Sequence, residues 1–316
     1  MSLGDERAVV AGRALRPLTA RRWAVASIAS VFVLVSAYVL AVLTPAGQAL
    51  ENAALRGADQ VREDEVAQAS QALGSITVVS LAMAVILVAG VGLLRRRVDL
   101  AVAGVAVITL GQIITQGLKR FVLPRPGLVE VTGDYTTNSF PSGHTTIAMT
   151  VLFALVIVAP YRWRGLTLLL TLSWAIGIGA YTVTAKWHRF SDTLGADAVA
   201  LLCACLAAWW LTRRGALRPY TGPARRARAV LAGLLAAAAV LLLALGLFLW
   251  VVPGLQGVDH SVPNETTDFT TYLGAHTLAA GCSAATALVY WVLWRRVEAA
   301  GGRADDRAQA PEKASR

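Results

Sequence analysis

The sequence predicts an all-α protein in which about eight helices cross a membrane as one bundle. Three observations support this fold class. Hydrophobic residues make up 56% of the 316 residues. Only 15% are charged, whereas soluble domains carry roughly 25%. The apolar residues also stand in long runs, which is the pattern of segments that cross a bilayer.

Eight apolar runs follow one another, and each approaches the ~20 residues that a helix needs to cross the hydrocarbon core. The first run is too long for the apolar part of a signal peptide, which measures about 7–15 residues, so we interpret it as a retained helix. The fourth run is short, and its helix is expected to start a few residues earlier. The eight runs are Trp23–Leu43, Leu73–Leu94, Leu100–Leu118, Thr145–Pro160, Leu166–Thr184, Thr193–Leu211, Val230–Val252 and Tyr272–Trp294.

The distribution of arginine predicts the orientation of these helices. With eight spans, the arginine-rich segments all fall on one side of the membrane, and the rule that positive charge stays inside makes that side cytoplasmic. Both termini then lie in the cytoplasm, and the membrane is expected to be a bacterial plasma membrane. Two loops on the opposite side, 44–72 and 253–271, are acidic. The arginine-rich segments are the N-terminal tail, 95–97, 162–164, 213–228 and 295–296.

Two segments on the predicted outer side, 119–144 and 185–192, carry basic residues against this trend. The second holds Lys186 and Arg189. The first holds Lys119 and Arg125, and Arg125 stands between two prolines that stiffen the chain where the third span ends. Arginine suits paired contacts with phosphate oxygens, and lysine supplies a point charge. Alone, a basic helix end is commonplace, because long cationic side chains often reach from a helix end to the membrane surface.

The stretch Pro141-Ser142-Gly143-His144 leads into the fourth span. Glycine lets a ligand approach the backbone closely, and the N–H groups at the start of a helix attract anions. Ser142 can donate a hydrogen bond, and His144 can give a proton to a leaving group. A plain turn beside an interfacial histidine explains the same four residues equally well.

His188 and Asp192 are four residues apart just before the sixth span. On a helix, this spacing places both side chains on one face. A carboxylate bonded to one imidazole nitrogen fixes the tautomer and leaves the other nitrogen as a nucleophile or base. As an isolated pair, this pattern is more often structural than catalytic.

The three segments fall on the same predicted outer face. A phosphate clamp, a proton donor and an oriented nucleophile can therefore meet at one depth, as phosphoryl transfer requires. Fixed cations would neutralise the phosphate, so no metal or other cofactor is expected. The three cysteines lie inside apolar runs, which indicates buried thiols and neither disulfides nor a metal cluster.

Together these motifs resemble the type 2 phosphatidic acid phosphatase (PAP2) family, which also includes vanadium haloperoxidases. The family pattern is K-x6-RP, PSGH and SR-x5-H-x3-D, and its membrane members have six core spans. PSGH matches at Pro141–His144, and H-x3-D matches at His188 and Asp192. The resemblance covers roughly residues 20–212 and implies the integral membrane lipid phosphatase branch.

The resemblance also implies a role for each matching residue. His188 resembles the nucleophile that forms a phosphohistidine, Asp192 its orienting carboxylate, and His144 the general acid. The residues that resemble the phosphate cradle are Lys119, Arg125, Ser142 and Gly143.

Two departures from the family pattern concern the cations. Five residues, not six, separate Lys119 from Arg125. The Ser-Arg pair of the third motif would fall at Tyr181-Thr182, so its arginine is absent. Either Lys186 or Arg189 is a candidate to replace it.

With this resemblance, we expect a six-helix catalytic core with an added helix pair. The expected segments are a basic cytoplasmic tail (1–22), the PAP2-like core (23–212), a basic cytoplasmic loop (213–228), the added pair (229–296) and a flexible cytoplasmic tail (297–316). The role of the added pair stays open. Nothing in the sequence indicates nucleic-acid binding, and assembly with a second copy stays open.

The predicted function is hydrolysis of a lipid phosphate monoester or a polyprenyl diphosphate through a phosphohistidine at the outer face, with membrane lipids around the bundle. A lipid phosphotransferase uses the same first steps, so the motifs do not separate the two. A transporter or anion-binding protein is the alternative from another class, although deep polar residues are few. A haloperoxidase fits less well, since those relatives are soluble. The loop 127–138 is expected to influence which lipid is bound, but no motif in it identifies that lipid.

Overall fold

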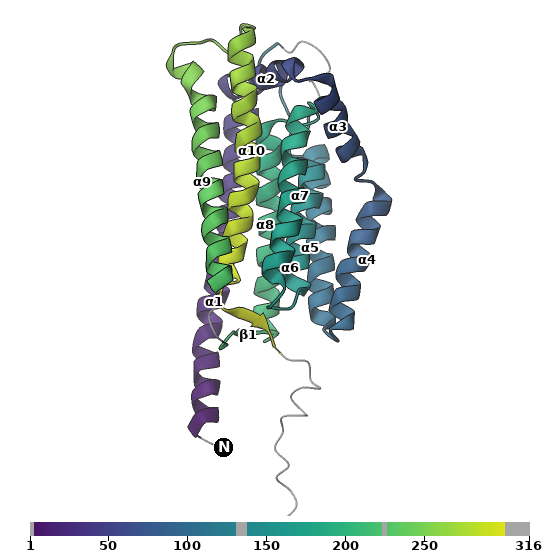
Figure 1. Ribbon diagram of the computed structural model, residues 1–316, viewed down its shortest axis with the longest axis vertical. Helices are drawn as coiled ribbons and strands as arrows, with labels where there is room; N and C mark the ends of the chain where they lie inside the picture. Colours follow the sequence, from purple (N-terminus) through teal and green to yellow (C-terminus); the bar gives the residue numbers. More distant parts are fainter. Residues whose placement is uncertain (1–2, 131–137, 223–225, 301–316) are drawn as a thin grey trace, which may run out of the picture.

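The computed structural model describes residues 3–130, 138–222 and 226–300, with side chains from residue 20 onward. Most of the expected C-terminal tail and of the loop 127–138 therefore lies outside the described residues, as do the side chains of the expected N-terminal tail. Within the described residues the chain is almost entirely helical, which confirms the predicted fold class (Figure 1).

Eight long helices lie where the eight apolar runs predict them. Six are long and apolar enough to cross a membrane, and α3 with α4 forms a seventh span if this bent pair counts as one. The eighth, α6, starts two residues before the predicted run and has only 16 residues. The eight are α1 (Leu3–Ala37), α4 (Val78–Leu94), α5 (Val98–Gly117), α6 (Gly143–Val158), α7 (Arg164–Thr184), α8 (Phe190–Arg213), α9 (Arg226–Leu255) and α10 (Glu265–Leu293). Short π-helical turns, Tyr38–Val42 and Leu118–Val122, continue α1 and α5.

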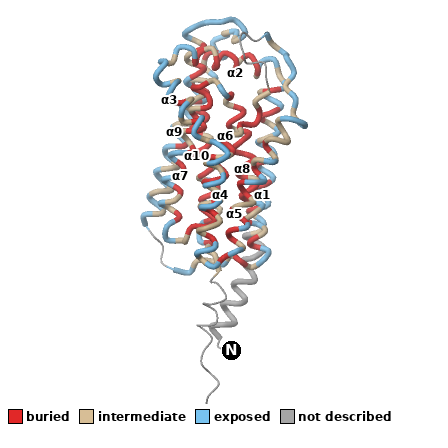
Figure 2. The backbone as a smooth tube through the Cα atoms, turned by 90° about the vertical axis from the view of Figure 1, so that its right-hand side faces the viewer, coloured by how far each residue is buried: buried red, intermediate tan, exposed pale blue. Residues whose placement is uncertain are grey.

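Helices α6 and α8 form the centre of the bundle. Of the 18 most apolar consecutive residues in each helix, 67% are buried in α8 but only 11% in α9. Helix α9 therefore lies at the periphery of the bundle, on the side expected to face lipid. In Figure 2, buried positions are concentrated in the interior of the bundle. Small residues let α5 approach α6 closely, since a Cβ added to Gly111 would lie 2.7 Å from the Thr150 methyl group.

At one end of the bundle, arginines bind carbonyl groups in the last turn of α6 and in the segment that follows α10. The side chain of Arg164 is fully buried and donates to the carbonyls of Val156 (3.0 Å) and Val297 (2.7 Å). Arg95 donates to the carbonyl of Val158. A two-stranded sheet, β1 (Leu217–Pro219) with β2 (Val297–Ala299), lies at this end. These arginines thus cap helices as well as marking one side of the bundle.

At the opposite end, the expected loop 44–72 is two helices instead, so that part of the prediction was wrong. Helix α2 (Pro45–Gly57) begins at Thr44, whose hydroxyl accepts a hydrogen bond from Gly47 N, and Pro45 suits the first helical position. A short 3₁₀ turn, Ala58–Gln60, and helix α3 (Glu63–Gly74) follow. Their many polar residues dilute the hydrophobic signal. α3 meets α4 at a bend of 57°.

Helix α2 is fastened to α10. The guanidinium of Arg56 donates to both carboxylate oxygens of Asp268 (2.8 and 2.9 Å) and to the carbonyl of His260 (2.8 Å). Gly57 lies so close to α10 that a Cβ added there would be 1.9 Å from the backbone carbonyl oxygen of Asp268. The added helix pair therefore supports α2, whichever further role it has.

Replacing Gly57 with alanine should lower the thermal stability of the purified protein, because the new methyl group meets backbone atoms that cannot move aside. Overpacking of this kind costs about 1–3 kcal/mol. Gly90, in α4, is the matched control because a Cβ there has nothing within 4 Å, and Gly→Ala inside a helix stabilises by roughly 0.5–1 kcal/mol. Thermal unfolding in detergent should move in opposite directions for the two variants. Equal melting temperatures would contradict the tight contact.

Candidate active site

The structure brings the second and third motifs together at the end of the bundle that carries α2. The backbone N–H of Ser142 donates to the carbonyl of Asp192 at 2.9 Å. Beside this contact, the buried ring of Phe140 packs against Gly195 on α8, where an added Cβ would lie 2.6 Å from the ring. Only glycine at this position lets the segment before α6 lie flat on the first turns of α8.

His188 and Asp192 contact each other as their spacing predicted. His188 Nδ1 lies 3.3 Å from Asp192 Oδ2, which leaves Nε2 as the nitrogen available to a reaction partner. The two are not on one helix, however, because α8 begins at Phe190. Asp192 instead closes the first turn of α8, and its Oδ2 also accepts from the backbone N–H of Arg189 at 2.8 Å. The same carboxylate thus caps the helix α8 and binds the imidazole of His188.

A tight turn after α7 sets the position of His188. Lys186 has a φ of +60°, in the left-handed region that usually holds glycine. The turn folds the chain back so that the N–H groups of Trp187 and His188 both donate to the carbonyl of Thr182 at 3.0 Å. Thr182 occupies the position where the family pattern has its arginine. Its backbone carbonyl therefore holds the turn that positions His188.

His144 stands in the first turn of α6, facing His188. The centroids of the two imidazole rings are 6.1 Å apart, and the ring of Trp187 meets His144 edge-on at 5.2 Å. Ser142 caps α6, since its hydroxyl oxygen accepts from Thr145 N at 3.3 Å, and a hydroxyl that accepts can still donate. The start of α6 at Gly143 leaves backbone N–H groups without helical partners next to His144.

The predicted cations come from the segment that follows α5. Lys119 is in the π-helical turn after α5, and its charge is close enough to attract that of Asp192. The segment after it is pinned by Asn138, whose amide donates to the carbonyls of Lys119 (3.0 Å) and Leu123 (2.6 Å). The side chain of Arg125 is only 5% exposed. Burial lowers the pKa of Arg125, and the nearby charge of Arg189 lowers it further.

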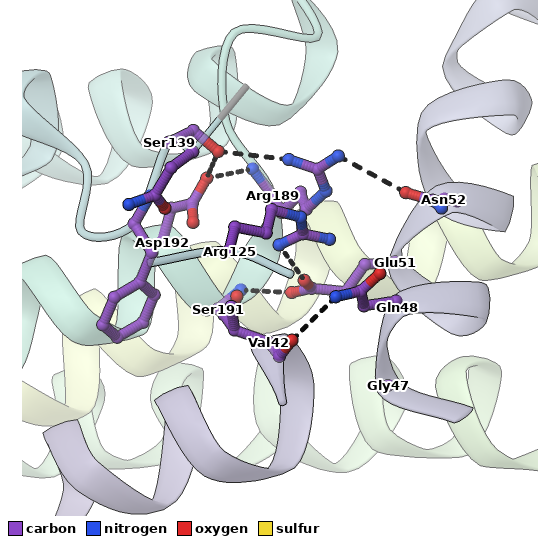
Figure 3. A network of polar contacts seen from close by, with 12 residues as sticks. Val42, Gly47, Gln48, Glu51, Asn52, Arg125, Ser139, Arg189, Ser191 and Asp192 are labelled. Carbon is purple, nitrogen blue, oxygen red and sulfur yellow. Dashed lines mark hydrogen bonds and ion pairs between the residues drawn. The ribbon is translucent and has the colours of Figure 1, made fainter. Parts of the chain in front are cut away.

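Sequence reasoning missed the contribution of α2, which places three polar side chains against this cationic half (Figure 3). Gln48 donates to the carbonyls of Val42 (2.8 Å) and Pro126 (2.7 Å) and so holds the loop that carries Arg125. The Thr44-Pro45 start signal, with polar residues recurring at helical spacing, could have revealed it. The three side chains are Gln48, Glu51 and Asn52, all at most 5% exposed.

Glu51 is the most unusual of the three. One of its carboxylate oxygens accepts from the backbone N–H of Ser191 at 2.8 Å, and the other lies 3.9 Å from Arg125 Nη1. Burial raises the pKa of Glu51 to about 7, and the charge of Asp192 adds to this effect, while the hydrogen bond from Ser191 and the two arginines oppose it. A buried carboxyl that changes charge near neutrality is more common in functional sites than elsewhere.

The two candidates for the missing arginine end up in different surroundings. Lys186 pairs with Asp59 in the 3₁₀ turn after α2. Arg189 is only 4% exposed, and its guanidinium donates to Ser139 Oγ (3.2 Å) and to Asn52 Oδ1 (3.4 Å) (Figure 3). Ser139 in turn donates to Asp192 Oδ2 at 2.5 Å. Arg189 therefore belongs to the network around Asp192, and Lys186 lies at its edge.

Two further groups of residues lie away from this network. Asp197, a fully buried acid in α8, accepts from Ser283 of α10 at 3.0 and 3.1 Å. Cys203, Cys205 and Cys282 are all free thiols. Among the described residues, no three histidine, cysteine or acidic side chains are grouped as a metal site requires.

Fold and site together define a membrane helix bundle that carries a histidine pair and a cluster of buried cations at one end. Residues 100–216 of this bundle, from α5 to just past the end of α8, match the family described as the PAP2 superfamily. The resemblance carried by the three motifs is thereby confirmed for this part of the chain. The first two spans of the expected six-helix core, α1 and α4, lie before the matched segment.

Comparison with solved structures adds one similar chain. It is the crystal structure of the first transmembrane PAP2 type phosphatidylglycerolphosphate phosphatase from Bacillus subtilis, which is 19% identical in sequence. The match covers 57% of the present chain and 93% of that chain, with a TM-score of 0.47. Comparison with curated protein sequences gave no match.

Glu51 should give the protein a pH-dependent stability. Its pKa is raised from 4.5 to about 7 by folding, so the folded state holds this proton more tightly than the unfolded state. The resulting stabilisation is complete below the lower value and is lost as pH rises through the upper one. Relative to Glu51→Gln, the wild-type protein should therefore lose melting temperature across this interval.

The measurement is thermal unfolding of both proteins at a series of pH values. Glu63→Gln, which alters an exposed glutamate at the start of α3, is the control and should follow the wild type. A constant offset between wild type and Glu51→Gln across the interval would show that Glu51 does not titrate there.

Proposed function

We propose that this protein is a membrane lipid phosphatase that works through a phosphohistidine on His188. The observation that carries the proposal is the His188–Asp192 contact, set between a second histidine on one side and buried arginines on the other. An oriented nucleophile, a proton donor and fixed cations are the three components of metal-free phosphoryl transfer. The superfamily match of residues 100–216 supports the same class of reaction.

In the first step, Nε2 of His188 attacks phosphorus, and the bond from phosphorus to the lipid oxygen breaks. Asp192 holds Nδ1–H, so the imidazole keeps the tautomer that attacks and its developing positive charge is balanced. In its protonated form, which the negative charge of the bound phosphate favours, His144 gives its proton to the departing lipid oxygen. In the second step, neutral His144 takes a proton from water, which attacks the phosphohistidine and releases inorganic phosphate and free His188.

The phosphate oxygens would be held by Lys119, Arg125, Ser142 and the N–H of Gly143. Arginine and lysine offset the negative charge, and the start of α6 adds the favourable end of its helix dipole. These cations lie in a buried environment, where electrostatic interactions are stronger than in water. On this basis the reaction needs no metal ion, and a chelator such as EDTA should leave the rate unchanged.

We place the site at the outer face of a plasma membrane. The arginine-capped end of the bundle is opposite the site, and arginine-rich ends stay in the cytoplasm. A lipid substrate can diffuse in the outer leaflet and present its phosphate at this end, with its hydrocarbon chains remaining in the bilayer. A lipid phosphate monoester and a polyprenyl diphosphate both meet these requirements.

His188→Ala should abolish phosphate release from the lipid substrate. Removal of the nucleophile should lower turnover by at least about a thousandfold. The assay is a panel of phosphatidic acid, phosphatidylglycerol phosphate and a polyprenyl diphosphate, each measured with and without orthovanadate, which should inhibit.

His276→Ala is the matched control, because His276 is a second histidine that contacts Thr184 and Tyr272 on the α7–α10 side of the bundle. It should retain most of the activity. Full activity of His188→Ala on the preferred substrate would refute the mechanism, whereas absence of turnover by the wild type on every lipid would refute the proposed function.

A further inference from the structure

Two guanidinium groups are buried beside each other under α2, although the motifs provide only one of them. Arg125 comes from the loop after α5, and Arg189 precedes α8. The interaction between their charges contributes to the lowered pKa of Arg125. Burying like charges together is costly unless an anion joins them. The carboxylates nearby are Glu51 and Asp192, and Asp192 is already engaged by three donors, which are Ser139, His188 and the backbone N–H of Arg189.

Arg125 is prepared for a ligand in one further respect. Its two terminal nitrogens, Nη1 and Nη2, are buried and make no hydrogen bond to any of the described residues. Glu51 Oε2, at 3.9 Å, is too far from Nη1 for a hydrogen bond. A guanidinium in such a position gains most from a tetrahedral oxyanion, which can accept from both nitrogens at once.

We propose that Arg189 is the third phosphate-binding cation of this site, in place of the arginine that the family pattern has at the position of Thr182, and that Asn52 of α2 positions its guanidinium. This inference rests on the proposed function. The supporting contacts are the hydrogen bonds of Arg189 to Ser139 and Asn52. Its backbone N–H bonds the same carboxylate oxygen that contacts His188, so the cation and the nucleophile are adjacent in sequence and share one anchor.

The alternative positions do not offer the same arrangement. Thr182 is fully buried inside α7, and its hydroxyl donates to the carbonyl of Gly179 at 2.7 Å. Lys186 extends to Asp59, and its side chain is 27% exposed. The third cation is thus Arg189, which follows His188, and not a residue of α7.

The inference also gives α2 a specific function. Asn52 accepts from Arg189, while Gln48 of the same helix holds the carbonyl of Pro126 in the loop of Arg125. One helix that the family motifs do not include thereby sets the position of both arginines. A change at Asn52 should act through Arg189 and through no other part of the site.

The test measures phosphate binding separately from turnover. Inorganic phosphate is titrated into the full-length protein carrying His188→Ala, in detergent, and binding is followed by calorimetry. Adding Arg189→Gln should weaken binding by about ten- to a hundredfold, because a charge-assisted hydrogen bond is lost. Lys186→Gln removes another positive charge, two residues before His188, and should change the affinity by less than about threefold. In the active protein, Arg189→Gln should raise KM for the lipid substrate, and Lys186→Gln should not.

A double-mutant cycle tests the role of Asn52. Asn52→Ala should weaken phosphate binding when Arg189 is present and have no effect in the Arg189→Gln background, because its contribution passes through that side chain. A purely structural role would lower binding equally in both backgrounds. If Arg189→Gln does not fold, Arg189→Lys keeps the charge without the planar fork and should give an intermediate affinity.

The outcomes separate the two proposals. Unchanged phosphate affinity in Arg189→Gln overturns the role of Arg189, even where the wild type hydrolyses lipid phosphates. Loss of phosphate binding in Arg189→Gln supports that role, even if no lipid is turned over and the proposed function fails. Absence of phosphate binding in the His188→Ala protein overturns the cation site itself.

Discussion

The site depends on the hydrogen bonds that the carboxylate of Asp192 accepts. Its Oδ2 atom accepts from Ser139, from the backbone of Arg189 and from His188, and its own carbonyl accepts from Ser142. These partners come from the segments before α6 and before α8, which the sequence separates by some 50 residues. A buried carboxylate is stable only when donors surround it. Because the buried carboxylate needs these donors, it keeps the two motifs in contact with each other.

The cationic half of the site is constructed differently. Its cations come from the segment after α5 and the segment before α8, and polar side chains of a third element, the helix α2, lie against them. Positive charges gathered in this way repel each other, and Glu51 with its raised pKa is a weak counterion. Such a cluster stores unfavourable electrostatic energy that an anionic substrate relieves on binding. The histidine half, in contrast, is held together by the hydrogen bonds of Asp192 to the segments before α6 and before α8.

Much of the fold and the histidine half of the site could be predicted from the sequence because their signals are local. Apolar runs gave the eight helices, and the four-residue spacing of His188 and Asp192 gave their contact, although α8 turned out to begin between them. The part that escaped prediction is α2. Its polar residues resemble those of a solvent-exposed loop, and only the tertiary structure shows that Gln48, Glu51 and Asn52 are buried. The choice between Lys186 and Arg189 likewise depended on Asp59 and Asn52, which are more than 120 residues away along the chain.

The fastening of α2 to α10 has a consequence for how the molecule is made. During synthesis α2 leaves the ribosome long before α10, yet its anchor at Asp268 is near the start of α10. The histidine half can form once α6 and α8 are inserted. The arginines under α2 receive their final support only once Asp268, which is 212 residues after Arg56, has been added to the chain. A nascent chain that already spans the membrane several times therefore still lacks a fully supported cation site, and completion of the site is coupled to insertion of α10.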